Sequence, residues 1–212
     1  DILPEELLNC VQGSHEGVWG ADVGLNEGFD LRQHTLMVLG QLQKVNPEAT
    51  NLLKFAVALH DIGKYKSAKI NDNTLQHKFT SVLTQNILDQ LKLPKKEQKI
   101  ILALIKTDPL GQLITSPGKP GNIQETTQLM SQLAVEAGMG NQKVEFFEML
   151  LDYYTADASS YTVLADFVDG PGRVDPNAAQ NNAFDLEASE ITFTQRNLDL
   201  LDQVRSGLEG DD

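Results

Sequence analysis

The sequence is poor in cysteine and in long apolar runs, and each shortage excludes a class of protein. The lone cysteine, Cys10, cannot form an internal disulfide. That fits a reducing compartment, so we expect a cytoplasmic protein in which Cys10 is a small buried hydrophobic residue. No stretch approaches the ~18 apolar residues of a membrane helix, so we expect no membrane partner. The N-terminus lacks the basic start and apolar stretch of a signal peptide.

Positive charge is also scarce. Seventeen basic residues face thirty acidic ones, which gives a formal net charge of -13. Such a field repels phosphate backbones, so we expect no nucleic-acid binding across the whole surface, although a local basic patch can still admit a nucleotide. The acidity also favours solubility. The chain begins without Met, so we expect it to be processed or to belong to a longer protein.

Alternating apolar and polar residues, the pattern of a half-buried strand, are missing as well. Apolar residues recur instead at helical spacing almost everywhere, which predicts an all-α fold. Caps, prolines and glycines predict helices over residues 4–11, 30–45, 47–63, 75–91, 94–104, 122–138, 142–167 and 191–208. The sequence predicts one helical domain over residues 1–168, a polar loop or linker over 169–190, and a C-terminal helix over 191–212 that packs on the same domain.

Three helical segments carry residues that can bind a metal. His34 lies within a predicted helix, His60 and Asp61 are adjacent near the end of the next, and Asp157 lies among small residues far downstream. Successive helical side chains diverge by ~100°, so one ion can contact both His60 and Asp61. Imidazole and carboxylate ligands suit Mn, Fe, Co, Ni or Zn, with Mg as a further option. Two nitrogens and two oxygens leave positions open for water.

Each of these residues also has a structural interpretation. His34 can be a core histidine with its hydrogen bonds satisfied. His60 can sit at a helix C-terminus, helped by the helix dipole, with Asp61 as a turn residue. Asp157 can form a buried ion pair.

Taken together, the four residues resemble the HD superfamily of phosphohydrolases. The pattern is His34, then the doublet His60-Asp61 followed by Ile62-Gly63-Lys64, then Asp157 between two alanines. The resemblance implies an HD-type helical bundle that binds a divalent transition metal through His34, His60, Asp61 and Asp157. It also implies a phosphomonoesterase or phosphodiesterase that uses a metal-bound hydroxide.

Further stretches are similar to the HD domain appended to bacterial CCA-adding tRNA nucleotidyltransferases: residues 15–19, 33–36, 60–64 and 76–77. This similarity implies a phosphorylated small molecule, a nucleotide, a cyclic phosphate or an RNA end as substrate. The nucleotidyltransferase half is not in this sequence, and neither are the landmarks of the HD-GYP enzymes or the acidic pair of the stringent-response hydrolases. Where many relatives have a further histidine, this chain has Lys106-Thr107-Asp108.

The resemblance also implies roles for the residues around the doublet. Asp61 or Asp108 orients or deprotonates the attacking water, Lys64 neutralises charge on the phosphoryl oxygens, and His77 binds a second metal or the phosphate. The catalytic set is therefore Asp61, Lys64, His77 and Asp108, with Lys64 and His77 binding substrate. Structural interpretations stay open here too: a lysine commonly follows a helix-ending glycine, His77 can be structural, and Asp108 can start a turn.

Residues 13–28 and 108–122 are predicted to be loops that choose the substrate. Within the first, His15 and Trp19 line the pocket or fill the core. Two rival functions remain at this stage. One is a catalytically silent, metal-binding regulatory or interaction module of the HD fold. The other is the HD part of a larger RNA-processing protein that acts on RNA ends.

Overall fold

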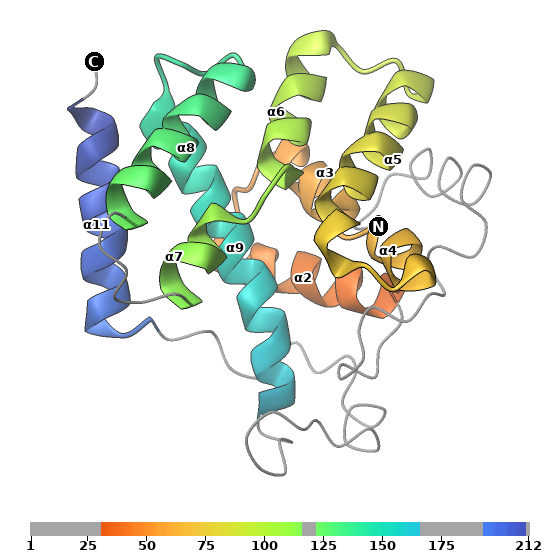
Figure 1. Cartoon of the computed structure of the whole chain (residues 1–212), viewed down its shortest axis with the longest axis horizontal. Coiled ribbons are helices and arrows are strands. Elements are labelled where there is room, and N and C mark those ends of the chain that lie inside the picture. Colours follow the sequence, from red (N-terminus) through yellow and green to blue (C-terminus); the bar gives the residue numbers. More distant parts are fainter. Residues whose placement is uncertain (1–30, 116–121, 166–192, 211–212) are drawn as a thin grey trace.

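The computed structural model describes residues 31–115, 122–165 and 193–210, and its regular elements are helical throughout (Figure 1). No strand occurs in these ranges, which confirms the predicted all-α fold. The helices are α2 (Leu31–Val45), α3 (Asn51–Leu59), α4 (Lys64–Ile70), a 3₁₀ turn η1 (Asn73–Leu75), α5 (Gln76–Gln90), α6 (Lys95–Ile105), α7 (Pro109–Thr115), α8 (Asn122–Glu136), α9 (Lys143–Ala165) and α11 (Gln195–Glu209).

Helix α9 runs through the middle of the molecule, and α2 crosses it in the most extensive helix pair (Figure 1). Both helices bury apolar side chains in the common core, among them Val38 and Leu42 of α2 and Phe146 of α9. Near one end of the pair, Asn46 Nδ2 donates a hydrogen bond of 2.7 Å to Asp152 Oδ2. This pairing places side chains that are more than a hundred residues apart in the sequence next to each other.

The remaining helices pack around this pair. Helix α3 lies against α2 and α6, α5 against α4 and α6, and α8 against α6, α7 and α9. Helix α11 packs on α8 and α9 and buries Leu201, Val204 and Leu208. The predicted linker over 169–190 and the predicted helix over 4–11 lie outside the described residues, so the predicted domain boundaries stay predictions.

The helix expected over 47–63 is shorter at both ends. It begins at Asn51, because Thr50 Oγ1 accepts the backbone N–H of Leu53 at 3.2 Å and so caps the helix. It ends at Leu59, so His60 and Asp61 lie in the turn that follows and not in the helix.

Two helices were not predicted. Helix α4 begins directly after Gly63, and α7 occupies residues that were expected to be a loop. The carboxylate of Asp108 explains α7, because its Oδ1 accepts the backbone N–H of Gly111 at 2.8 Å and Pro109 takes the first helical position.

Gly63 allows a close approach between the turn after α3 and the start of α5. A Cβ atom built on Gly63 would lie 2.4 Å from Gln76 O, Thr80 N and Thr80 Oγ1. The backbone N–H of Gly63 itself donates to Thr80 Oγ1 at 3.1 Å. The turn that carries His60 and Asp61 is therefore held directly against α5. Among the described residues, no helix combines the length and the apolar composition needed to cross a membrane.

Candidate metal centre and adjoining pocket

Three separate elements supply the cluster of imidazoles and carboxylates. Helix α2 supplies His34, the turn after α3 supplies His60 and Asp61, and α9 supplies Asp157. His34, His60 and Asp61 are each less than 5% exposed. Small buried residues flank Asp157 on α9, namely Ala156, Ser159 and Ser160. Their size lets the neighbouring elements approach the carboxylate closely.

Two imidazole nitrogens and two carboxylate oxygens face one another at the centre of this cluster. His34 Nε2 lies 3.3 Å from His60 Nε2, 3.0 Å from Asp61 Oδ2 and 3.3 Å from Asp157 Oδ1. His60 Nε2 lies 3.2 Å from Asp61 Oδ2 and 3.4 Å from Asp157 Oδ1. For ligand bonds of ~2.1 Å, neighbouring ligands are roughly 3.0 Å apart in an octahedron and roughly 3.4 Å apart in a tetrahedron. The observed spacings match the edges of a coordination sphere.

The hydrogen bonds around the cluster also fit a metal. His60 Nδ1 donates to Val57 O at 2.5 Å, which directs the other ring nitrogen, Nε2, towards the cluster. Two protonated Nε2 atoms facing each other at 3.3 Å would repel. Asp157 Oδ1 is buried and receives no well-aligned hydrogen bond from the described residues. A cation bound by His34 Nε2, His60 Nε2 and Asp157 Oδ1 would remove this repulsion and give the buried carboxylate oxygen a partner. His34, His60 and Asp157 accordingly form a group that can hold a metal ion.

The histidines and carboxylates of the cluster shift one another's pKa values towards their charged forms. Burial opposes the charged form of His60, but the charge of Asp61 and the contact with Asp157 outweigh it and raise its pKa to about 10. The pKa of His34 is raised against the same opposition by its contacts with Asp157 and Asp61. Although burial favours the neutral acids, the cationic neighbours hold the pKa values of Asp61 and Asp157 well below the usual range. A divalent cation would supply positive charge to the same two carboxylates.

Asp61 is fixed by two further side chains. Gln76 Nε2, at the start of α5, donates to Asp61 Oδ1 at 2.8 Å. Lys64 Nζ, at the start of α4, contacts Asp61 Oδ2 at 2.8 Å, and its side chain is 15% exposed. One oxygen of Asp61 is thus held by an amide, while the other lies between the lysine and the two imidazoles. The carboxylate is oriented even without a metal.

A pocket of about 220 Å³ opens beside the cluster. It brings together the residues that the sequence predicted as catalytic or substrate-binding, because Asp61, Lys64, His77 and Asp108 all line it. His60 and Asp157 line it too, whereas His34 is buried and does not line it. The side chain of Asp157 is 27% exposed, so the cluster borders the pocket and is not sealed off from it.

Asp108 has both a structural contact and an unusual environment. Its carboxylate accepts the Gly111 N–H that caps α7, as the turn-starter interpretation expected. Part of the Asp108 residue is exposed, but its carboxyl group lies against the pocket wall. This partial burial and the nearby charge of Asp157 raise the pKa of the Asp108 carboxyl group. His77 lines the same pocket, and its Nδ1 is buried without a hydrogen bond to any described residue.

Sequence reasoning missed three residues of the site. Gln76 orients Asp61, but nothing in the sequence marked it beyond its place next to His77. Tyr153 and Tyr154 also line the pocket, and the ring of Tyr153 packs edge-on against His60, with 5.4 Å between centroids. Tyr153 precedes Asp157 by four residues on α9, a spacing that places both on one helix face and could have identified it. His15 and Trp19 lie outside the described residues.

Comparisons with known proteins relate the chain to one domain family. A family model described as the HD domain matches residues 31–153, more than half of the chain. The chain is also similar to the A-adding tRNA nucleotidyltransferase of Deinococcus radiodurans, with 34% identity over 93 residues. The similar stretch covers 39% of this chain and 21% of that protein, so the chain spans only about a fifth of the relative's length. No solved structure was found to match the chain.

Proposed function

Because this chain belongs to the HD domain family, we propose that it is a metal-dependent phosphohydrolase that cleaves a phosphomonoester or phosphodiester in the pocket beside His60 and Asp61. The observation that carries the proposal is that the Nε2 atoms of His34 and His60 lie 3.3 Å apart, each 3.0–3.4 Å from carboxylate oxygens of Asp61 and Asp157, next to a pocket that contains a lysine. Oxygen and nitrogen donors at these spacings suit a metal. A cationic side chain beside them suits a phosphate.

The metal ligands in this proposal are His34, His60, Asp61 and Asp157. Imidazole and carboxylate donors fit a divalent transition metal, Mn, Fe, Co, Ni or Zn, with Mg as a further option. Such an ion, when bound, supplies Lewis-acid chemistry that makes water a nucleophile near neutral pH and polarises a phosphoryl oxygen. The remaining chemistry belongs to side chains of the pocket.

Lys64 is the proposed phosphate contact. Its ammonium group lies at the pocket wall, 2.8 Å from Asp61 Oδ2, so a phosphoryl group that reaches the cluster also reaches this cation. A fixed positive charge at that point stabilises the charge that grows on the phosphoryl oxygens during cleavage. His77 offers a second donor, because its buried Nδ1 has no hydrogen bond to the described residues.

Asp61 and Asp108 are the proposed groups for positioning the attacking water. Asp61 is oriented by Gln76, and so its carboxylate can hold a water molecule without first reorganising. Asp108 lines the same pocket, and partial burial raises its pKa, which brings the carboxyl group closer to the range of a useful general acid or base. Tyr153 and Tyr154 form part of the wall that excludes bulk water.

The substrate that we propose is a phosphorylated small molecule, a nucleotide, a 2′,3′-cyclic phosphate or an RNA end. A pocket of about 220 Å³ is smaller than the ~300–1,000 Å³ of sites that enclose a whole drug-sized ligand. It accommodates the phosphoryl group and its immediate neighbours, while the rest of the substrate lies outside. The name of the similar Deinococcus radiodurans protein, which acts on tRNA, supports a substrate related to RNA.

The test combines metal content with turnover. Elemental analysis of the purified chain is followed by a screen of phosphomonoesters, cyclic phosphates and nucleotides with added Mn, Ni, Co, Zn and Mg. Asp157→Asn keeps the shape of the side chain but removes a proposed ligand charge, and we expect it to lose both metal and activity. The matched control is Asp202→Asn, at an exposed position on α11, which keeps both. Metal without turnover on any substrate would favour the silent module instead.

A further inference from the structure

The basic residues of this acidic protein are concentrated in one region. Residues 64–106, which form α4, η1, α5 and α6, contain nine lysines and three acidic residues, a net charge of +6. The net charge of the chain is -13, so the residues outside this region carry -19. The negative net charge of the whole chain therefore includes one region of positive net charge.

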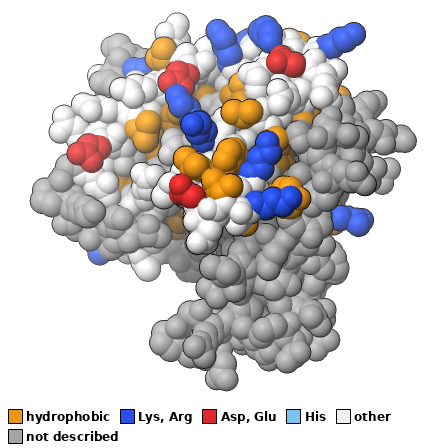
Figure 2. Space-filling model, turned by 45° about the vertical axis from the view of Figure 1, so that its right-hand side comes forward, with side chains coloured by type: hydrophobic (Ala, Val, Ile, Leu, Met, Phe, Trp, Pro, Cys, Tyr) orange, Lys and Arg blue, Asp and Glu red, His pale blue; other side chains and the backbone are white. Residues whose placement is uncertain are grey.

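The lysines of this region reach the surface. Eight of the nine are exposed: Lys66, Lys69, Lys78, Lys92, Lys95, Lys96, Lys99 and Lys106. On the face drawn in Figure 2, basic side chains are gathered around a patch of apolar ones, and acidic side chains are few. Salt bridges neutralise only part of this charge, since Lys95 pairs with Asp89 and Lys106 with Glu136, whereas Lys78 and Lys99 form no ion pair with any described residue.

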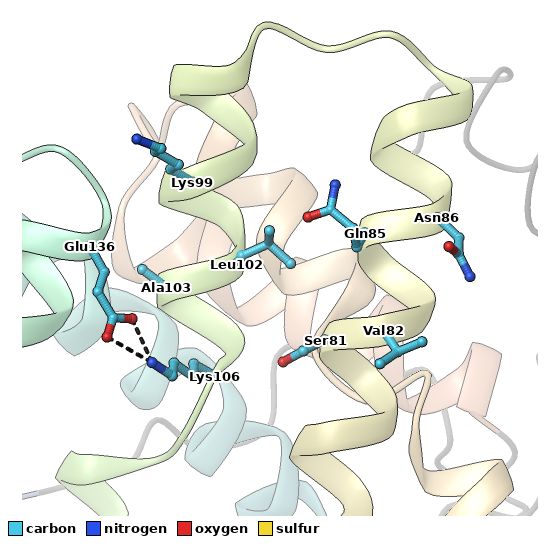
Figure 3. A pocket seen from close by; sticks show the side chains of 9 residues that line it. All are labelled: Ser81, Val82, Gln85, Asn86, Lys99, Leu102, Ala103, Lys106 and Glu136. Atoms are coloured by element: carbon cyan, nitrogen blue, oxygen red, sulfur yellow. Dashed lines mark hydrogen bonds and ion pairs between the residues drawn. The ribbon is translucent and has the colours of Figure 1, made fainter.

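A groove of about 480 Å³ lies on this face between α5 and α6 (Figure 3). Its walls combine three kinds of side chain. Val82 and Leu102 are apolar, and Gln85 and Asn86 offer amide donors and acceptors. Lys99 contributes positive charge, whereas Lys106 at the groove is paired with Glu136. Figure 3 shows Leu102 and Gln85 pointing towards each other across the groove. Apolar surface, amides and cations together match a ligand that has flat rings, hydrogen-bonding edges and negative charges.

The groove adjoins the candidate catalytic pocket at two points. On α5, His77 lines the pocket, and Ser81, one helical turn further, lines the groove. At the end of α6, Lys106 lines the groove, and its neighbour Thr107 lines the pocket. A chain-like ligand that follows the groove can therefore place its end beside the metal ligands.

We propose that the groove between α5 and α6 binds single-stranded nucleic acid and delivers its phosphorylated end to the pocket. This proposal rests on the proposed function and names its substrate class. The lysines contact backbone phosphates, and the apolar wall with its amides receives the sugars and bases. An acidic peptide would satisfy the lysines alone, without using the apolar wall or presenting a phosphate ester to the pocket.

Binding is measured by fluorescence anisotropy of a labelled single-stranded oligoribonucleotide of about twelve nucleotides, over a range of salt concentrations. Lys99→Ala removes a cation that lines the groove, and Lys78→Ala removes an exposed one on α5, four residues before Val82 and so on the same helix face. A phosphate contact to a single strand contributes ~0.7 to the slope of log affinity against log salt, so each variant should weaken binding about fivefold near 0.1 M salt and flatten the slope. The matched control is Arg196→Ala, an exposed cation on α11, which lies across the molecule from α5 in Figure 1 and should leave binding unchanged.

Three outcomes would overturn the proposal: equal losses for Lys99→Ala and Arg196→Ala, affinity independent of salt, or displacement of the oligonucleotide by polyglutamate of the same charge as efficiently as by unlabelled strand. Hydrolysis of a small phosphodiester by the wild-type chain is measured separately. Binding without hydrolysis would contradict the proposed function but keep the groove. Hydrolysis without salt-dependent binding would support the proposed function and contradict the role of the groove in binding the substrate.

Discussion

Replacing Gly63 with alanine tests how the turn that carries His60 and Asp61 is fixed against α5. The new Cβ atom would lie 2.4 Å from backbone atoms of Gln76 and Thr80, whereas comfortable contacts begin near 3.5 Å. The turn and α5 must therefore separate by about 1 Å. Overpacking of this kind costs ~1–3 kcal/mol of the free energy of unfolding. For a chain of this size, that lowers the melting temperature by roughly 2–12 °C.

The same displacement moves Gln76 away from Asp61, whose Oδ1 it contacts at 2.8 Å. Loss of a side chain that orients a metal ligand typically weakens metal binding ~10–100-fold. Calorimetric melting and metal titration therefore measure two consequences of one change. The matched control is Gly210→Ala at the end of α11, where a new Cβ would lie 3.7 Å from Ser206 O and the backbone is in an ordinary helical conformation. If Gly63→Ala and Gly210→Ala melt alike and bind metal alike, the close approach at Gly63 has no role in positioning the site.

Three further predictions follow from individual contacts. Lys64→Met should lower kcat ~10–1,000-fold in steady-state assays while metal content persists, because Lys64 contacts the phosphoryl group and does not bind the ion. An unchanged kcat would contradict this role. Metal binding should release protons and tighten as pH rises, since the pKa values of His34 and His60 are raised by their carboxylate neighbours and a metal competes with protons for the same nitrogens. Titration calorimetry in two buffers of different ionisation enthalpy measures this, and the absence of proton release would refute it. Phe146→Ala should lower the free energy of unfolding, measured by urea denaturation, by ~3–5 kcal/mol, because this side chain of α9 is fully buried in the core. A loss below ~1 kcal/mol would contradict this and show that the core collapses around the cavity.

The sequence predicts the helical fold well because apolar periodicity is local information. The all-α fold and the relationship to the HD family are both confirmed. The predicted start at Asn122 agrees with α8, since Asn122 is its first residue. Helix ends were less predictable, because they depend on single capping contacts. The cap at Thr50 places the start of α3 several residues after the predicted start, and the cap at Asp108 allows α7 to form inside an expected loop.

Some residues of the candidate site could be predicted from the sequence, and others could not. His34, His60, Asp61 and Asp157 were predicted from residue type and order, and the structure brings their side chains together, although their role as ligands stays a prediction. Gln76 was not predicted, because its role comes only from the approach of α5 to the turn after α3.

The basic groove was also not predicted. The concentration of lysines in residues 64–106 can be read from the sequence, but only the packing of α5 against α6 shows that a groove lies among them.

Anomalous scattering from crystals grown with Mn²⁺ would show whether the cluster of His34, His60, Asp61 and Asp157 binds a metal. We expect one strong manganese peak ~2.1 Å from His34 Nε2, His60 Nε2 and Asp157 Oδ1, with Asp61 Oδ2 as a fourth ligand. In Asp157→Asn crystals the peak should be lost or much weakened while the fold is kept. No peak between the two imidazoles of the wild-type protein, or a peak only elsewhere in the molecule, would contradict the assignment of this cluster as the metal centre.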